Sequence, residues 1–274
     1  MRRHAFSRFP LGYWNCMEFE SVAANLRESF RIVAAHREGG ELQEMEGVSI
    51  ASAGVTFQMF NSAFLSAPVV SEAQMDRRVT QAAVHFAARG QRWAYWICHG
   101  WLDGRTRRRL QSVLRKRNLY QAVELPGMFA EDVLPPLREL PKMELRRVSD
   151  GPVKDAFCAI GATCFNVPLA WFREVFDSST VWSDFAAYVG YVDGDPVCTA
   201  ATVIGGGAIG IYNVATMPHR RCAGYGEAVM RYALERARSE HGYARTILQS
   251  TPQGFALYQR MGYRTVTSIG VFCS

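Results

Sequence analysis

One segment, residues 216–228, constrains the fold of this chain more than any other. It reads Thr-Met-Pro-His-Arg-Arg-Cys-Ala-Gly-Tyr-Gly-Glu-Ala and joins an apolar, strand-like run to an amphipathic helical pattern. Backbone N–H groups left unpaired at a helix N-terminus favour a phosphate, and the helix dipole adds to that preference. Gly224 and Gly226 let the backbone approach such a ligand closely, and Arg221 can add a planar cationic fork. The segment therefore predicts an anion site between a strand and a helix.

Two other phosphate-binding motifs are excluded. A dinucleotide fingerprint needs a third glycine, but Val229 stands there, and Ala244 stands where an acidic ribose ligand is expected. A Walker loop needs Gly-Lys followed by Ser or Thr, and that combination occurs nowhere in the chain. Neither nucleotide-binding fold is therefore predicted.

The glycine loop and a second short motif both resemble one family. Residues 221–226 match, at every fixed position, the acyl-CoA-binding motif of the GNAT superfamily of N-acetyltransferases: Arg or Gln, two residues, Gly, one residue, and Gly or Ala. Residues 257–263, Leu-Tyr-Gln-Arg-Met-Gly-Tyr, resemble the family's Leu-Tyr-x-x-x-Gly-Phe/Tyr element. Each motif alone is also compatible with a plain helix start or with an aromatic side chain packed on a helix. Together they indicate that residues 143–274 are similar to a GNAT domain.

The hydrophobic patterning of this half predicts the element order of that fold. An alternating strand and two helices come first, a three-stranded meander follows, and the glycine loop leads into a long helix. The predicted elements are strand 143–148, helices 153–164 and 168–176, strands 185–192, 197–204 and 208–216, helix 225–240, strand 245–249, helix 253–261 and strand 263–272. We therefore expect the α/β (α+β) class, with a mixed central sheet and flanking helices.

Prolines divide the chain into two halves. Leu134-Pro135-Pro136 and Leu140-Pro141 bracket a short polar segment, which is typical of a linker. We expect an N-terminal domain over residues 1–134, a linker over residues 135–142 and a catalytic domain over residues 143–274.

The first half repeats the pattern of the second in a degenerate form. Residues 60–68 resemble residues 212–218, and a helical pattern at 72–88 and a strand pattern at 93–98 follow. Residues 69–73, Val-Val-Ser-Glu-Ala, have no glycine or arginine and carry a carboxylate where a pyrophosphate would lie. Like charge and crowding oppose phosphate binding there. We expect two GNAT-like halves in tandem, of which the N-terminal one cannot bind coenzyme A.

The resemblance also implies roles for individual residues. In GNAT enzymes the strand before the glycine loop bulges and opens a V between two parallel strands, where the pantetheine arm binds backbone groups. Asn213 lies on that strand and could also hold a water that relays a proton, and Tyr258 is expected to return a proton to the departing thiolate. These two are the predicted catalytic residues. The predicted cofactor-binding residues are Val214, Ala215, Thr216, Arg221, Cys222, Ala223, Gly224, Tyr225, Gly226, Ser250 and Phe255.

The general base and the acceptor site are left open by the sequence. Asp184, His219 and Glu227 are conceivable bases, and an amine that arrives neutral would need none. Four aromatic side chains could line an apolar acceptor pocket or pack between the early helices and the sheet. They are Trp171, Phe172, Phe176 and Trp182.

The expected reaction moves an acetyl group from acetyl-CoA (coenzyme A) to the amine of a small-molecule or peptide acceptor. Two alternatives stay open: a non-catalytic, acyl-CoA-responsive binding or regulatory module, and acyl transfer to a hydroxyl or thiol. The seven cysteines are scattered, with no pair at two-residue spacing, so the sequence predicts neither a disulfide framework nor a zinc site. No metal is expected.

Charge and hydropathy limit the partners. The net charge of +6 suits an anionic ligand. The arginines of residues 105–109 are followed by apolar residues at helical spacing, which predicts a solvated helix face rather than a nucleic-acid site. No apolar run reaches the roughly 18 residues of a membrane-spanning helix. We therefore expect a cytoplasmic protein without a membrane partner, as a monomer or homodimer.

Overall fold

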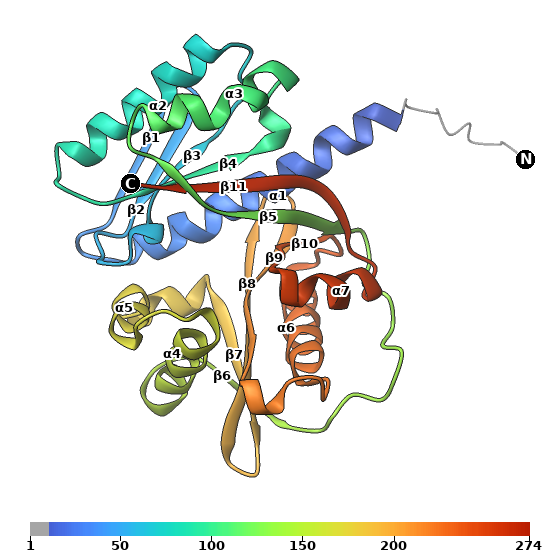
Figure 1. Ribbon diagram of the computed structural model, residues 1–274. Coiled ribbons are helices and arrows are strands. Elements are labelled where there is room, and N and C mark those ends of the chain that lie inside the picture. The colour runs from blue at the N-terminus through green and yellow to red at the C-terminus, as the bar shows by residue number, and fades with distance from the viewer. Residues whose placement is uncertain (1–10) are drawn as a thin grey trace, which may run out of the picture.

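The computed structural model describes residues 11–274, with side chains from residue 18 onward, so the predicted N-terminal domain begins outside the described residues. In this part of the chain, eleven strands form one mixed sheet that seven α-helices flank (Figure 1). The predicted fold class is confirmed. The strands are β1 (Glu41–Met45), β2 (Val48–Ser52), β3 (Asn61–Leu65), β4 (Ala94–Cys98), β5 (Tyr120–Ala130), β6 (Glu144–Arg147), β7 (Ala186–Val192), β8 (Asp195–Gly205), β9 (Ala208–Thr216), β10 (Thr246–Gln249) and β11 (Arg264–Cys273). The helices are α1 (Leu11–Ala35), α2 (Glu72–Ala87), α3 (Gly104–Arg115), α4 (Gly151–Phe165), α5 (Leu169–Val175), α6 (Tyr225–His241) and α7 (Pro252–Arg260), with short 3₁₀ turns η1 (Gln58–Phe60), η2 (His99–Trp101), η3 (Ser179–Ser183) and η4 (Pro218–Arg220).

Local sequence signals place the helix ends. The carboxylate of Asp150 accepts the Gly151 N–H at the start of α4, and the hydroxyl of Thr251 accepts the Gly254 N–H at the start of α7. Gly242, with a φ of 73°, ends α6 in the left-handed conformation that glycine adopts without strain. None of the helices in the described residues is long and apolar enough to cross a membrane.

The strands follow the order β1-β2-β3-β4-β11-β5-β10-β9-β8-β7-β6. Two neighbouring pairs are parallel, β3 with β4 and β9 with β10, and the other pairs are antiparallel. Alternate side chains pack with α2, α3, α6 and α7 on one face and with α1, α4 and α5 on the other. Each half therefore contributes one parallel pair, covered by the helix that connects its two strands and by the helix after the second strand.

The two halves exchange their last strands. β5 ends the first half, yet it lies between β10 and β11 of the second half. β11 ends the second half, yet it pairs with β4 of the first half from Ile269 to Cys273. The sheet is consequently continuous across the linker, and neither half contains all the strands of its own part of the sheet. The pattern of the sequence predicts the two halves but not this exchange.

Helix α1 also ties the halves together, and the patterns described above do not predict it. The side-chain amide of Asn25 donates hydrogen bonds to the carbonyl oxygens of Val203, Gly205 and Ala208 at 2.9–3.1 Å, in the β8–β9 hairpin of the second half. The hydroxyl of Tyr212, on β9, donates to Asn25 Oδ1 at 2.6 Å. A helix that precedes the first strand is thus fixed to the strand that leads to the glycine loop.

Candidate functional site

The parallel strands β9 and β10 separate to form a V. They pair only as far as Ile211 and Leu248. Beyond this point β10 stays with β5, and the Ser250 N–H donates to the Pro126 carbonyl oxygen at 2.9 Å. β9 instead stays with β8 until Thr216. The edge of β9 that faces β10 therefore has no strand partner beyond Ile211.

A β-bulge lies at the base of this opening. Tyr212 pairs with Ala201 and Ala215 with Thr199, so two residues of β9 face one residue of β8. Asn213 lies inside the bulge with a φ of 49°, a left-handed conformation that asparagine tolerates better than most side chains. The Thr199 hydroxyl holds the turned backbone by donating to the Asn213 carbonyl oxygen at 2.7 Å. The bulge expected in this strand is thus present.

The glycine loop leaves the start of α6 without a side-chain cap. Gly224 is the N-cap residue, with a φ of 93°, and no side chain accepts a hydrogen bond from the first turn. A Cβ on Gly226 would lie 2.9 Å from the hydroxyl oxygen of Thr216, so the close approach of loop and strand needs glycine there. The amides of this turn therefore remain available to an anion.

Positive charge surrounds these amides. Arg221 is exposed, and its Nε donates to the Thr216 carbonyl oxygen at 3.1 Å. The Nε of Arg220 is buried and has no hydrogen-bond partner among the described residues. Glu227 is the acidic residue of the first turn, but Arg231 neutralises it at 2.8 Å. The loop is consequently a cationic helix N-terminus with no acceptor of its own.

Tyr258 packs beneath the V from the α7 side. Its side chain is buried with Ile211 and Leu248, the last pair before the strands separate, and Phe255 packs against the same cluster. A Cβ on Gly254 would lie 2.7 Å from the Tyr258 ring, so this helix turn is shaped around the phenol. Burial raises the pKa of Tyr258 to about 12, because desolvation disfavours the phenolate. Tyr258 is therefore a protonated hydrogen-bond donor at neutral pH.

Each arm of the V carries a side-chain amide without an acceptor. Asn213 Nδ2 on β9 and Gln249 Nε2 on β10 are buried and have no hydrogen-bond partner among the described residues. A buried donor left unpaired costs roughly 1–3 kcal/mol, so such groups are common where a ligand supplies the acceptor. Ser250 differs, because it is fully buried and its hydroxyl already donates to the Thr251 carbonyl oxygen at 2.8 Å.

The aromatic residues of α4, α5 and η3 form a core rather than an open pocket. Phe172, Phe176 and Trp182 are buried in one cluster with Phe157, which confirms the packing interpretation for these three. Trp171 is 38% exposed and lies 6.0 Å, centroid to centroid, from Phe57 of the first half. Only Trp171 could therefore meet an acceptor without rearrangement of the core.

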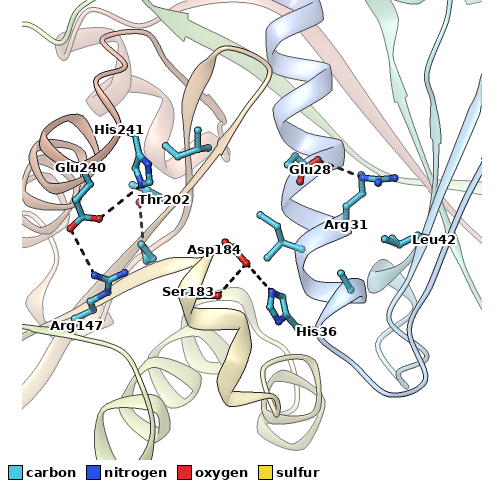
Figure 2. Close-up of a pocket in the computed structure, with 14 residues that line it drawn as sticks. Glu28, Arg31, His36, Leu42, Arg147, Ser183, Asp184, Thr202, Glu240 and His241 are labelled. Carbon is cyan, nitrogen blue, oxygen red and sulfur yellow. Dashed lines mark hydrogen bonds and ion pairs between the residues drawn. The ribbon is translucent and has the colours of Figure 1, made fainter.

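Asp184, one of the conceivable bases, lies in a different cleft. This cleft has a volume of about 480 Å³ and lies between α1 and the second half; Figure 2 shows His36 Nε2 directed at the Asp184 carboxylate, 2.9 Å away. β7 runs in the same direction as β9, and its first residue, Ala186, lies level with Ile211 across the sheet. Asp184 precedes Ala186, so it lies beside the paired part of β9, before Ile211, and not beside the part where β9 and β10 separate.

The two other base candidates lie nearer the glycine loop. His219 is exposed in η4, and Glu227 is paired with Arg231. The structure thus brings together the β9 bulge, the glycine loop, Phe255 and Tyr258, and it separates Asp184 from them. Arg220 precedes the loop in η4, and sequence reasoning did not single out its buried Nε without a hydrogen-bond partner among the described residues.

Comparison with known proteins agrees with this geometry. Residues 183–265 match the family model of the acetyltransferase (GNAT) domain. No curated protein is similar enough in sequence to be matched.

Solved structures extend the comparison to nearly the whole chain. A GCN5-related N-acetyltransferase from Kribbella flavida is similar, with a TM-score of 0.70 and 19% identity, over 94% of this chain and 95% of that one. A GCN5-related N-acetyltransferase from Sphaerobacter thermophilus has a TM-score of 0.54 and 13% identity over 97% and 94%. A tandem GNAT protein from the clavulanic acid biosynthesis pathway has a TM-score of 0.52 and 10% identity over 96% and 95%. At these identities the likeness shows the fold, which is that of tandem GNAT proteins, as predicted.

Proposed function

We propose that this chain, whose C-terminal half carries a GNAT acetyltransferase domain, moves an acetyl group from acetyl-CoA to the amine of a small molecule or peptide. One observation carries the proposal. An uncapped, cationic helix N-terminus, a bulged strand with a free edge and a buried, protonated tyrosine adjoin the same opening between β9 and β10. The first suits a diphosphate, the second an extended amide-bearing arm, and the third a leaving thiolate.

The reaction needs each of these parts in turn. The acceptor amine loses its proton, because an alkylammonium with a pKa near 10 has no lone pair. Its nitrogen then forms a bond to the thioester carbonyl carbon, and the bond from that carbon to sulfur breaks. Backbone N–H groups of the bulged strand, at Asn213 to Thr216, are the proposed donors to the oxyanion; one such donor is worth roughly 3 kcal/mol.

Tyr258 supplies a hydrogen bond to the departing sulfur in this scheme. Burial that raises its pKa to about 12 keeps the phenol protonated, but it also penalises the phenolate that full proton transfer would leave. The proton released by the amine therefore has to restore the phenol. An ammonium acceptor loses two protons in all: the first goes to solvent before attack, and the second, from the attacking nitrogen, restores the phenol. The net products are an amide, a free thiol, one proton released to solvent and an unchanged tyrosine.

Release of free thiol from acetyl-CoA, measured across a panel of small amines and short peptides, tests the proposal. Turnover that depends on an amine, with an N-acetyl product identified by mass spectrometry, is the expected result. Binding of acetyl-CoA without turnover for any amine, hydroxyl or thiol would favour the alternative of an acyl-CoA-responsive module. An O-acetyl or S-acetyl product would keep the transferase and replace the acceptor class.

A further inference from the structure

The linker between the two halves passes over the glycine loop. Just before the linker, the Leu134 N–H donates to the Met261 carbonyl oxygen at 3.0 Å, and Figure 1 shows the chain running from beside α7 towards the turn that precedes α6. There Arg138 Nη2 donates to the Cys222 carbonyl oxygen at 3.2 Å. A Cβ on Gly224 would lie 3.1 Å from Pro141 Cδ and 3.6 Å from Arg138 Nη2, so two linker side chains lie beside the N-cap residue of α6. A segment that joins domains in the sequence thus forms one wall of the anion site.

The guanidinium groups of Arg138 and Arg221 lie at this helix end, and Arg220 precedes the loop in η4. Arg138 donates to the Cys222 carbonyl oxygen in the loop and Arg221 to the Thr216 carbonyl oxygen at the end of β9. Arg220 has a buried Nε without a partner among the described residues. The N-terminus of a helix is itself the positive end of the helix dipole. Cations gathered there repel one another and the dipole unless an anion lies between them. This arrangement is typical of an anion-binding site.

We infer that Arg138, from the linker, binds a phosphate group of the acyl-CoA cosubstrate and completes the site that the glycine loop begins. The inference rests on the proposed function. Arg138 is exposed, and its hydrogen bond to Cys222 uses a single N–H of a fork that carries five. The remaining N–H groups can donate to two phosphate oxygens side by side, a geometry that arginine provides and lysine does not.

Two phosphate groups of coenzyme A present this chemistry, the diphosphate and the 3′-phosphate on the ribose. Gly224 and Arg221 already adjoin the place for a diphosphate, so Arg138 can either share that group or bind the second one. The loop motif alone does not include Arg138, because the contact joins residues 84 positions apart in the chain. The linker consequently contributes a residue that binds the cosubstrate, in addition to connecting the two halves.

Calorimetric titration of the full-length chain with coenzyme A tests the inference. Arg138→Gln removes the charge and the fork, Arg138→Lys keeps only the charge, and Lys142→Gln removes a neighbouring exposed charge from the same linker. We expect about tenfold weaker binding for Arg138→Gln, a smaller loss for Arg138→Lys and a change within about twofold for Lys142→Gln. Titration with dephospho-coenzyme A then separates the two phosphate sources. A loss that persists assigns Arg138 to the diphosphate, and a loss that disappears assigns it to the 3′-phosphate.

Two results would overturn the inference. Wild-type affinity in Arg138→Gln would show that the fork makes no contact with the ligand. An equal loss in Arg138→Gln and Lys142→Gln would show that only the general field of the linker matters. Failure of the proposed function is distinguishable from both, because it appears in the wild-type chain, either as no binding of coenzyme A or as binding of acetyl-CoA without turnover, whatever the Arg138 variants do.

Discussion

The two halves of the sheet each contain a parallel strand pair whose strands are connected by a helix, but only one pair opens. In the second half, β9 leaves β10 after Ile211 and turns to β8 through the bulge. In the first half, the segment after β3 rejoins the segment after β4: the Val69 N–H donates to the Trp101 carbonyl oxygen at 2.8 Å, and Val69 forms a parallel bridge with Leu102. The backbone groups that could bind an extended ligand are thus used by the protein itself.

The two helix starts differ in the same way. At α2 the Ser71 hydroxyl accepts the Gln74 N–H at 3.2 Å, and Gln74 Oε1 accepts the Val70 N–H at 3.0 Å. Glu72 adds negative charge to the first turn. At α6 the cap is Gly224, and no side chain takes its place. Side chains accept hydrogen bonds from amides at the start of α2 but not at the start of α6. The fold alone therefore does not make a phosphate site.

Each half has an arginine at the connection between its strand and the following helix, but the two arginines differ in exposure. In the first half, Arg78 is only 5% exposed, and its Nη1 donates to the carbonyl oxygens of Ala67 and Pro68 at 2.7 and 2.9 Å. It holds the strand-to-helix connection from inside. In the second half, Arg221 holds its connection through one bond to Thr216 and keeps the rest of its fork in solvent. Arginine is therefore a buried structural residue in the first half and an exposed cation in the second.

The largest expected effect comes from separating the halves. Residues 143–274 alone lack β5, which is paired along both β10 and β11, so those two strands lose their common neighbour. We expect this fragment to show no cooperative thermal unfolding by circular dichroism, because an unpaired interior of a sheet leaves buried backbone groups unsatisfied.

Co-expression with residues 1–142 is the matched control, and it should restore a complex that unfolds cooperatively. An isolated C-terminal fragment that melts cooperatively and binds coenzyme A would show that the halves are independent despite the exchanged strands.

The second effect comes from giving α6 the cap that α2 has. In Gly224→Ser the new hydroxyl would accept amides of the first turn, and the side chain would meet Pro141. We expect coenzyme A binding to weaken by about 100-fold or more, since two charged hydrogen bonds of about 1.5 kcal/mol each are lost. Calorimetry measures the affinity directly.

Gly207→Ser controls for backbone strain, because Gly207 also has a positive φ, 72°, but lies in open space on the β8–β9 hairpin. It should lose stability without losing affinity for coenzyme A. Equal losses of affinity in the two variants would contradict a role for the free cap.

Sequence patterns predicted the elements well because they depend on local signals. Strand 208–216 and the glycine loop agree with β9 and the start of α6. Residues 113–119 of the first half line up with residues 257–263, which matches Leu114 with Tyr258 and Asn118 with Gly262. Asn118 and Gly262 both adopt positive φ values, 57° and 95°. The strand exchange was not predicted, because β5 and β11 would satisfy a sheet in either half equally well by pattern. Arg138 was missed for a related reason: no local period links a linker residue to a loop far along the chain.

The third effect concerns Tyr258, whose counterpart in the aligned first half is the buried aliphatic Leu114. Tyr258→Phe removes the hydroxyl, so that the second half, like the first with Leu114, has none at this position. We expect kcat to fall by about 10 to 1000-fold, as is usual for loss of a positioned proton donor, with coenzyme A affinity unchanged. Steady-state kinetics and calorimetry measure the two quantities. Turnover equal to wild type would remove Tyr258 from the mechanism.

The same variant should alter the response to alkali. Burial raises the pKa of Tyr258 from 10.0 in the unfolded chain to about 12, so the native state favours the phenol. Its stabilising contribution is complete below pH 10 and is lost as the pH rises from 10 to about 12. Thermal melts of Tyr258→Phe should therefore depend less on pH in that window than wild-type melts do; an unchanged dependence would contradict the buried phenol.

The smallest expected effect comes from the first half, where the bridge between Val69 and Leu102 closes the parallel strands. Ser71→Ala removes the hydroxyl that caps α2 and should cost about 1 kcal/mol of unfolding free energy, the usual worth of such a cap. Acetyl-transfer kinetics and coenzyme A affinity should stay at wild-type values, because the amides freed at α2 still face Glu72 and a strand pair closed by Val69. Urea unfolding measures the first quantity. A second coenzyme A site in the titration of Ser71→Ala would mean that the cap alone, rather than the closed strands, keeps the first half from binding.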